Sequence, residues 1–229
     1  MSASLRVLFL DNHLLVLDKP AGIPTVPDAS GDTSLFDLAR EHVRAEFSKP
    51  GRVFLGAVQR LDRPVSGVIV FARTSKAASR LVAAQREGRF TKTYLAIGEG
   101  RPRGREGVVE QWLGKDERRN RVLVLDGERP EARRALTHWR VLAQEGERTL
   151  YELAPRTGRA HQLRVACASL GTPLLGDLKY GASKALPDRS VALHALRIVL
   201  SHPTRGTELA FQAPPPAGQA WGILRAAGP

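Results

Sequence analysis

Short apolar runs separated by turn residues dominate this chain of 229 residues, and that pattern limits it to folds rich in β-strands. Residues 6–10 and 13–17 are two such runs, and the Asp11-Asn12 pair between them predicts a hairpin. The other runs of this kind are residues 53–58, 68–71, 90–97, 137–143, 149–154, 191–200 and 208–211. Because short turns join many of these runs, we expect an α+β fold with a mixed, largely antiparallel sheet.

A few segments have the apolar spacing of helices instead. Residues 35–43 follow Asp32 or Thr33, either of which could cap a helix, and residues 75–86 have the same periodicity. A third helix is expected after Gly158. These helices would alternate with the strands in an α+β chain.

Residues 101–134 differ from the rest of the chain because they are rich in Arg, Gly and Glu. Their apolar stretches are short, as at residues 122–125. We expect a variable, exposed excursion there, within a single catalytic domain that spans residues 1–229. The sequence contains no internal repeat and no low-complexity tail.

The chain is strongly basic, with 35 lysines and arginines against 23 acidic residues and a formal net charge of +12. Such a charge attracts phosphates and anionic surfaces, although a basic surface without any specific partner has the same composition. The sequence has no apolar run long enough for a signal peptide or a membrane span. We therefore expect a cytoplasmic protein that does not act at a membrane.

Metal and cofactor sites lack the residues that they need. Cys167 is the single cysteine, so neither a disulfide framework nor a cysteine metal site can form within the chain. The histidines are scattered, without a ligand-spaced pair, and the glycines near residues 98–104 do not form a phosphate-binding loop. Ser66 also lacks the G-x-S-x-G context of a serine hydrolase. We expect no metal, no cofactor and no reaction that depends on ATP or NAD.

The segment with the clearest chemical character is residues 59–67, Gln-Arg-Leu-Asp-Arg-Pro-Val-Ser-Gly. It places the Asp62 carboxylate between Arg60 and Arg63 and then turns tightly before Gly67. A lone aspartate before a turn is more often a structural hydrogen-bond acceptor. A loop between two strands is also where a rigid scaffold presents a reactive group, so Asp62 is the first candidate for a catalytic residue.

A second cluster, residues 155–164, concentrates cations at the expected start of the third helix. His161 and Arg164 are three residues apart and would share a helix face. Cations there oppose the helix dipole by roughly 0.3–1 kcal/mol each. This cost suggests an anionic partner, either a carboxylate of the protein or a phosphate of a ligand, and the alternative is a solvated basic turn.

The third candidate is the pair Lys92 and Tyr94, which would share one face of the strand expected at residues 90–97. A tyrosine in a strand commonly packs in the core. Its alternative role is a platform on which a nucleic-acid base stacks, a contact worth roughly 1–3 kcal/mol.

These segments match the motifs of a known family in the right order along nearly the whole chain. Residues 59–67 are similar to its H-R-L-D-x-x-T-S-G motif, and residues 157–166 to T-G-R-x-H-Q-[IL]-R-V-H. Residues 171–181 resemble G-x-P-[IL]-x-G-D-x-x-Y-G. The opening and closing matches are residues 13–22, 193–195, 201–203 and 213–215. The chain thus resembles the RluA-type pseudouridine synthases, which isomerise specific uridines in ribosomal or transfer RNA.

The resemblance implies the pseudouridine synthase fold, an α+β fold whose mixed, largely antiparallel sheet lies in two lobes with a central active-site cleft. It implies a reaction without a cofactor, in which the glycosidic bond of a flipped uridine breaks, the uracil turns and C5 bonds to the ribose. Ribosomal or transfer RNA is the partner that it implies, and we expect a monomer.

The family motifs also imply roles for individual residues. Asp62 matches the catalytic aspartate, Tyr94 the tyrosine that stacks on the target base, and Arg164 the arginine that pairs with the aspartate. Arg60 matches the arginine that fills the gap left in the RNA stack, and Leu163 would line the pocket. The other candidates for RNA binding are Lys92, Arg159 and His161.

Three positions depart from the family motifs: Gln59 and Ala166 replace histidines, and Val65 replaces a threonine. The departures are expected to alter loop packing and substrate choice. They favour slightly an alternative function, a non-catalytic RNA-binding or ribosome-assembly protein that kept the fold, which the retained catalytic set disfavours. We expect no separate N-terminal RNA-binding domain, so specificity would come from the catalytic domain.

Overall fold

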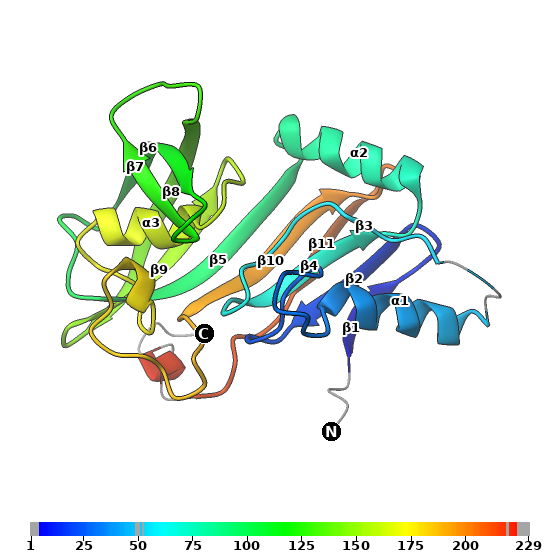
Figure 1. Ribbon diagram of the computed structural model, residues 1–229, viewed down its shortest axis with the longest axis horizontal. Helices are drawn as coiled ribbons and strands as arrows, with labels where there is room; N and C mark the ends of the chain where they lie inside the picture. The colour runs from blue at the N-terminus through cyan, green and yellow to red at the C-terminus, as the bar shows by residue number, and fades with distance from the viewer. Residues whose placement is uncertain (1–4, 49–50, 52, 219, 224–229) are drawn as a thin grey trace. The chain divides into compact units, whose positions relative to one another are not determined.

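The computed structural model describes residues 5–48, 51, 53–218 and 220–223 (Figure 1). The chain forms two compact units, of which unit 1 comprises residues 1–92 and 195–214 and unit 2 comprises residues 93–194 and 215–229. Strands β5 (Phe90–Glu99) and β10 (Leu193–Ser201) begin in one unit and end in the other. No helix in the described part of the chain is long and apolar enough to cross a membrane.

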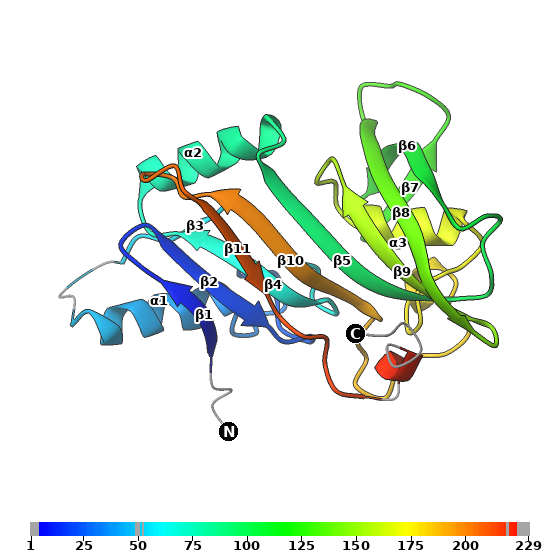
Figure 2. The same cartoon turned by 180° about the vertical axis from the view of Figure 1, so that it is seen from behind.

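Unit 1 is built on strands that are adjacent in the order β1, β2, β4 and β10 (Figure 2). Off this order, β11 pairs with β10 and a short β3 pairs with β4. Their bounds are β1 Arg6–Leu10, β2 Leu14–Lys19, β3 Gly56–Ala57, β4 Ser66–Ala72 and β11 Glu208–Gln212. The antiparallel β1–β2 pair confirms the expected hairpin, and β10 and β11, which also pair antiparallel, confirm the strands expected near residues 191–200 and 208–211.

Two helices cover opposite faces of strand β4. Val70 belongs to the same apolar cluster as Leu81 of α2 (Ser75–Arg86). The next residue, Phe71, packs edge-on against Phe36 of α1 (Leu35–Glu46), with 5.8 Å between the ring centroids. Successive side chains of a strand point to opposite faces, so β4 is buried on both sides. That is why every residue of β4 is buried.

The first helix begins one or two residues later than the sequence indicated. The expected cap, Asp32 or Thr33, is wrong, because Ser34 caps α1 through a reciprocal capping box with Asp37. The Ser34 hydroxyl accepts from the Asp37 amide, and the Asp37 carboxylate accepts from the Ser34 amide, both at 3.2 Å. The bounds predicted for the second helix, residues 75–86, are confirmed by α2.

The strand expected at residues 53–58 is largely wrong, since only Gly56 and Ala57 pair with β4. Val53 and Leu55 are nevertheless buried, and Phe54 between them is exposed. Alternating burial therefore occurs here without a ladder of backbone hydrogen bonds, which is why the apolar pattern suggested a longer strand.

Unit 2 contains strands in the order β5, β9, β8, β6 and β7, each antiparallel to its neighbour. Their bounds are β6 Glu106–Asp116, β7 Arg121–Leu125, β8 Arg133–Glu145 and β9 Arg148–Pro155. Residues 101–134, where an exposed excursion was expected, thus form mainly β6, β7 and the start of β8. Helix α3 (Gln162–Ser169) packs against these strands through a cluster that includes Ala135 and Val165.

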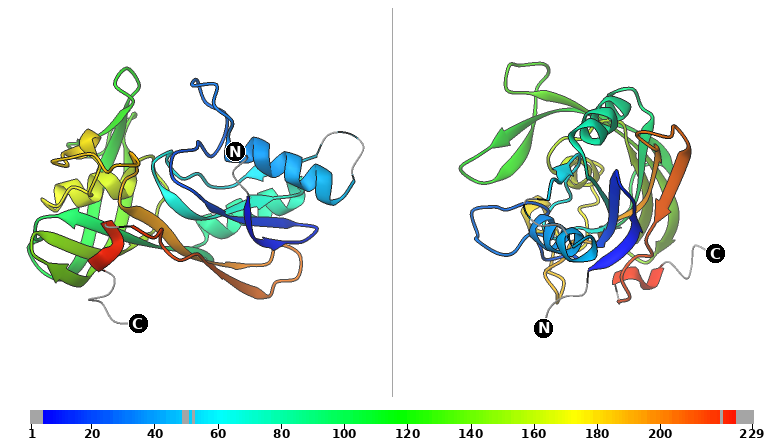
Figure 3. Two further views of the ribbon diagram at one scale, coloured as in Figure 1. Left: turned by 90° about the horizontal axis from the view of Figure 1, so that it is seen from below. Right: turned by 90° about the vertical axis from the view of Figure 1, so that its right-hand side faces the viewer.

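The two hairpin turns of unit 1 lie side by side at one end of its sheet (Figure 3). His202, in the turn after β10, is buried, and its Nε2 lies 2.8 Å from the Oδ2 atom of Asp11 in the turn before β2. The other carboxylate oxygen of Asp11 accepts from the amides of His13 and Leu14, both at 2.8 Å. The side chains of one hairpin therefore fix the turn of the other.

Candidate active site

Asp62 stands at the start of a tight turn that leads into β4. The amide of Val65 donates to the carbonyl of Asp62 over 3.0 Å and closes the turn. Asp62 is partly buried, whereas Leu61 before it and Val65 after it are buried. The turn thus anchors its two apolar ends in the core and holds the carboxylate between them.

Lys19, the last residue of β2, lies fully buried under this turn. Its ammonium nitrogen lies 2.7 Å from the carbonyl oxygen of Val65, 3.2 Å from that of Arg63 and 3.4 Å from that of Asp62. It also donates to the carbonyl of Pro20 over 3.0 Å. One cation therefore organises three backbone carbonyls of the turn.

Burial and the Asp62 charge have opposite effects on the pKa of Lys19. Burial lowers the pKa of its ammonium from 10.5 to about 7, and the Asp62 carboxylate opposes that change by attraction. The Lys19 ammonium and the Asp62 carboxylate therefore attract each other.

Two further contacts fix the segments on either side of the turn. The Thr25 hydroxyl donates to the carbonyl of Leu61 over 2.7 Å and accepts from its amide over 3.1 Å. Gly67 has a φ of +116°, and a Cβ atom there would lie 2.3 Å from the carbonyl oxygen of Ala195. Only glycine allows this close approach of β4 to β10. The position of Asp62 is therefore determined from both ends of its loop.

The two arginines that flank Asp62 in the sequence have different surroundings. Arg63 pairs with Asp32 over 2.7 Å and with Asp28 over 3.4 Å, on the loop before α1. Arg60 is exposed. Arg63 therefore links the Asp62 turn to the loop before α1, and Arg60 is accessible to a ligand.

The two departures from the family motif near Asp62 are both buried. Val65 is 2% exposed, and it fills an apolar position. Gln59 is buried as well, and its Nε2 atom has no hydrogen-bond partner among the described residues. A buried amide group without a hydrogen-bond partner costs free energy, so the Gln59 side chain destabilises this loop.

In unit 2, Arg164 of α3 is buried and makes a bidentate ion pair with the buried carboxylate of Asp177. The Nε–Oδ2 and Nη2–Oδ1 distances are both 2.7 Å. The Arg164 guanidinium carbon also lies 5.1 Å from the centre of the Tyr180 ring. Arg164 thus has the protein carboxylate that was one of the two anionic partners expected for this cluster, and its fork is fixed in direction.

His161 precedes α3 rather than lying on it, so the expectation of a helix face shared with Arg164 is wrong. It is the cap residue, in the left-handed region with φ 50°, and the helix begins at Gln162. Its Nδ1 atom lies 2.6 Å from the Tyr180 hydroxyl. That hydroxyl also accepts from the amide of Val122 over 2.9 Å, so Tyr180 joins α3 to the β6–β7 hairpin.

The remaining candidates differ in their exposure. Tyr94 of β5 is 8% exposed and Leu163 of α3 is 6% exposed. Arg159 is exposed, and its Nε donates to the carbonyl of Arg134. Lys92 lies 5.8 Å from the Phe90 ring, and burial lowers its pKa.

Comparison with known proteins identifies the family of this chain. The family described as RNA pseudouridylate synthase matches residues 13–169, more than half of the chain. The chain belongs to the RNA pseudouridine synthases. An uncharacterized RNA pseudouridine synthase of Bacillus subtilis is 38% identical over 93% of this chain and 69% of its own length. The ribosomal large subunit pseudouridine synthase D of Zymomonas mobilis is 35% identical over the same shares.

A solved structure supports the fold. Human RNA pseudouridylate synthase domain containing 4 is 25% identical, with a TM-score of 0.78, and the match covers 96% of this chain and 92% of that one. The expected α+β pseudouridine synthase fold is therefore confirmed, as is the membership inferred from the motifs. This RNA pseudouridine synthase is an isomerase that acts on RNA.

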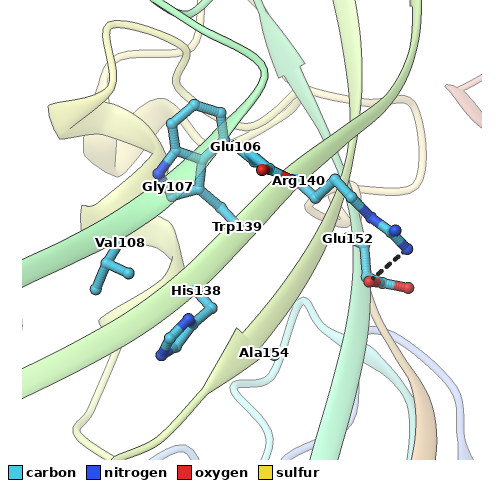
Figure 4. A pocket seen from close by; sticks show the side chains of 8 residues that line it. All are labelled: Glu106, Gly107, Val108, His138, Trp139, Arg140, Glu152 and Ala154. Atoms are coloured by element: carbon cyan, nitrogen blue, oxygen red, sulfur yellow. Dashed lines mark hydrogen bonds and ion pairs between the residues drawn. The ribbon is translucent and has the colours of Figure 1, made fainter.

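A pocket of about 380 Å³ lies elsewhere on unit 2 of the synthase, over strands β6, β8 and β9 (Figure 4). It is lined by Glu106, Gly107, Val108, His138, Trp139, Arg140, Glu152 and Ala154. Arg140 pairs with Glu152 over 3.0 Å at its edge, and Glu106 adds a second carboxylate. This balance of charge does not favour a polyanion, so the pocket is not assigned to RNA.

Sequence reasoning did not assign the residues that support the motif side chains. Lys19, Thr25, Asp177 and Tyr180 all contact them or their backbone, from segments distant in the sequence. Lys19, Asp177 and Tyr180 lie within the quoted family motifs, which is the signal that could have identified them. Thr25 carries no local signal of its role.

Proposed function

We propose that Asp62 is the catalytic carboxylate of this pseudouridine synthase and that its substrate is RNA of the large ribosomal subunit. The observation that carries the first part is the construction of the Asp62 turn. A buried ammonium, a buried hydroxyl and an obligatory glycine all serve this one loop. Such preorganisation is expected where a group must be held in a productive geometry.

The surroundings of the turn suit a carboxylate. The buried side chain of Lys19 lies under the turn, and the Asp62 carboxylate attracts its charge. In the proposed reaction the glycosidic bond of the target uridine breaks, the uracil turns, and its C5 atom bonds to the ribose carbon while the C5 proton is lost and N1 gains one.

The other residues keep the roles that the family motifs imply. Tyr94 stacks on the target base, Arg164 supports the aspartate, and Leu163 lines the base pocket. The rigid Arg164–Asp177 pair supports this proposal, because a fixed guanidinium can orient a second acceptor through its remaining donors. The pairing of Arg164 with Asp62 stays a prediction.

RNA contacts are proposed for Arg60, Lys92, Arg159 and His161. Exposure of Arg60 and Arg159 supports direct contact with the RNA backbone or with the gap that a flipped uridine leaves. Extruding a uridine costs a few kcal/mol, and a side chain that fills the vacated space offsets part of that cost.

The choice of ribosomal RNA rests on the relatives. Several proteins that are 32–35% identical to this chain are named ribosomal large subunit pseudouridine synthase D. Ribosomal RNA as substrate also supports a place in the cytoplasm, and we propose that the enzyme works there as a monomer without a nucleotide cofactor.

A map of pseudouridines in ribosomal and transfer RNA from cells with and without the gene tests this proposal. At least one pseudouridine in large-subunit ribosomal RNA should disappear without the gene. It should return with the wild-type gene and with Asp126→Asn, which removes an exposed carboxylate after β7. It should not return with Asp62→Asn. Loss confined to transfer RNA would contradict the substrate, and an unchanged map would favour a non-catalytic RNA-binding protein.

A further inference from the structure

A second pocket, of about 440 Å³, lies in unit 1 between helix α2 and the β10–β11 turn. These two elements lie side by side in both views of the molecule (Figures 1 and 2). The pocket is lined by Arg80, Ala83, Ala84, Arg89, Ser201, His202, Pro203, Thr204, Arg205 and Gly206. We refer to it as the arginine pocket.

The charge of the arginine pocket is one-sided. Arg80 comes from α2, Arg89 from the segment after that helix, and Arg205 from the β10–β11 turn, and all three are exposed. Among the described residues that line the pocket, none is acidic. Glu87 pairs with Arg89, and Asp11 lies 3.7 Å from Arg205, but both contacts engage one edge of a guanidinium that has five donors.

The turn that carries Arg205 is held rigidly. The buried His202 accepts at Nδ1 from the amides of Thr204 and Arg205, over 3.3 and 3.1 Å. Its Nε2 lies against Asp11, as described above. Arg80 donates to the carbonyl of Pro203 over 2.7 Å and so joins α2 to the turn. Preorganised guanidinium groups lose less conformational entropy when they bind an anion.

The arginine pocket is separate from the Asp62 turn. Strand β2 connects them, since Lys19 at its end supports the Asp62 turn, and Asp11 just before its start holds His202. At about 3.3 Å per residue, the strand from Leu14 to Lys19 spans roughly 17 Å. A ligand in the pocket would therefore lie a comparable distance from the Asp62 carboxylate.

We propose that the arginine pocket binds phosphates of the substrate RNA at a point remote from the target uridine. The proposal rests on RNA as the substrate of the proposed function. Guanidinium groups match phosphate oxygens in pairs, and a polyanion held at one end by the catalytic loop would reach a second cationic site at high effective concentration. Contacts of this kind fix the register of the RNA without reading its sequence.

The test compares two triple variants in binding to large-subunit ribosomal RNA transcribed in vitro. The pocket variant is Arg80→Gln with Arg89→Gln and Arg205→Gln. The control variant, Arg6→Gln with Arg44→Gln and Arg86→Gln, removes the same charge from exposed arginines of unit 1 that do not line the pocket. Affinity is measured as a function of salt, and KM and kcat for pseudouridine formation are measured on the same RNA.

The pocket variant should bind more weakly, and the magnitude of the slope of log affinity against log salt should fall by about 2 to 3, because each lost phosphate contact removes about 0.7 to 0.9. KM should rise while kcat at saturating RNA stays unchanged, and the control variant should change far less. Equal effects of both triple variants would overturn the proposal, since they would reflect net charge alone. An unchanged slope for the pocket variant would also overturn it.

Two further arms keep the result interpretable. Arg89→Gln with Arg205→Gln leaves the Arg80–Pro203 contact intact, so it should show the same direction of change even where the triple variant unfolds. Asp62→Asn should keep the wild-type salt slope. If Asp62→Asn still forms pseudouridine, the proposed role of Asp62 is wrong. The comparison of the two arginine triple variants still tests whether the arginine pocket binds RNA.

Discussion

Arg164 and Asp177 form a doubly hydrogen-bonded ion pair in which both side chains are buried and both distances are 2.7 Å. Arg164 lies in α3, and Asp177 immediately precedes a short 3-10 helix, Leu178–Tyr180. A family motif assigned Arg164 to the catalytic aspartate, and the structure adds the carboxylate that holds the arginine in place.

Asp177→Asn should destabilise the protein by roughly 3–5 kcal/mol, because it leaves the buried guanidinium without a matching charge. Urea denaturation measures this free energy of unfolding. The matched control is Glu152→Gln, which breaks the exposed pair with Arg140, and it should have little effect since solvent screens that pair. An equal loss of unfolding free energy in the two variants would show that the buried Arg164–Asp177 pair stabilises the protein no more than the exposed one.

Lys19 should make the stability of unit 1 depend on pH in a definite direction. Its pKa is about 7 in the folded protein and 10.5 without burial. Between these values the unfolded chain binds the proton and the folded protein does not, so stability should rise as pH rises from 7 toward 10. The expected rise is up to about 1.4 kcal/mol per pH unit. Below pH 7 both states are protonated, and this dependence should vanish.

The measurement is the free energy of unfolding of the wild type at pH 7, 8 and 9, minus that of Lys19→Met under the same conditions. The difference removes the contribution of all other titrating groups, and Met keeps the length and apolar stem of the side chain. Parallel curves for the two proteins would contradict a lowered pKa for Lys19.

Gly67→Ala should destabilise the protein far more than Gly88→Ala. Both glycines have a positive φ, +116° and +72°, so both variants incur the backbone strain of an L-residue, of order 1–2 kcal/mol. Only at Gly67 would the new Cβ also meet a backbone atom, the carbonyl oxygen of Ala195 at 2.3 Å. Comparing the thermal unfolding midpoints of the two variants separates backbone strain from the steric clash with Ala195. Similar midpoints would argue against the close approach of β4 to β10.

Cys167 should be inert in the folded protein. It is fully buried, and burial raises the pKa of its thiol to about 12, so almost no thiolate is present at pH 8. A colourimetric thiol reagent should react at pH 8 only after unfolding in urea. Rapid reaction of the native protein would show that the α3 region opens readily.

The parts of the structure that sequence predicted are those fixed by local pattern. Helix α2 has a regular apolar period and a threonine cap, and its bounds were correct. The cap of α1 was misplaced because Asp32, Thr33 and Ser34 all suit a cap, and only Ser34 is three residues before Asp37.

The tertiary parts could not be predicted in the same way. Lys19 lies in the opening motif, residues 13–22, which gave it no role, and its burial depends on four carbonyls that converge only in the fold. The choice of Asp177 as the partner of Arg164 likewise depends on how the chain returns after α3. Residues 101–134 form strands although their composition is polar, because β6 and β7 pair with each other and leave many of their side chains exposed.

The most direct test of the central claim is single-turnover pseudouridine formation by the purified protein on unmodified large-subunit ribosomal RNA, with wild type and Asp62→Asn compared at saturating RNA. Asp62→Asn should bind the RNA with the affinity and salt dependence of the wild type and form no pseudouridine. Pseudouridine formation by Asp62→Asn at a rate close to that of the wild type would contradict the assignment of Asp62 as the catalytic carboxylate.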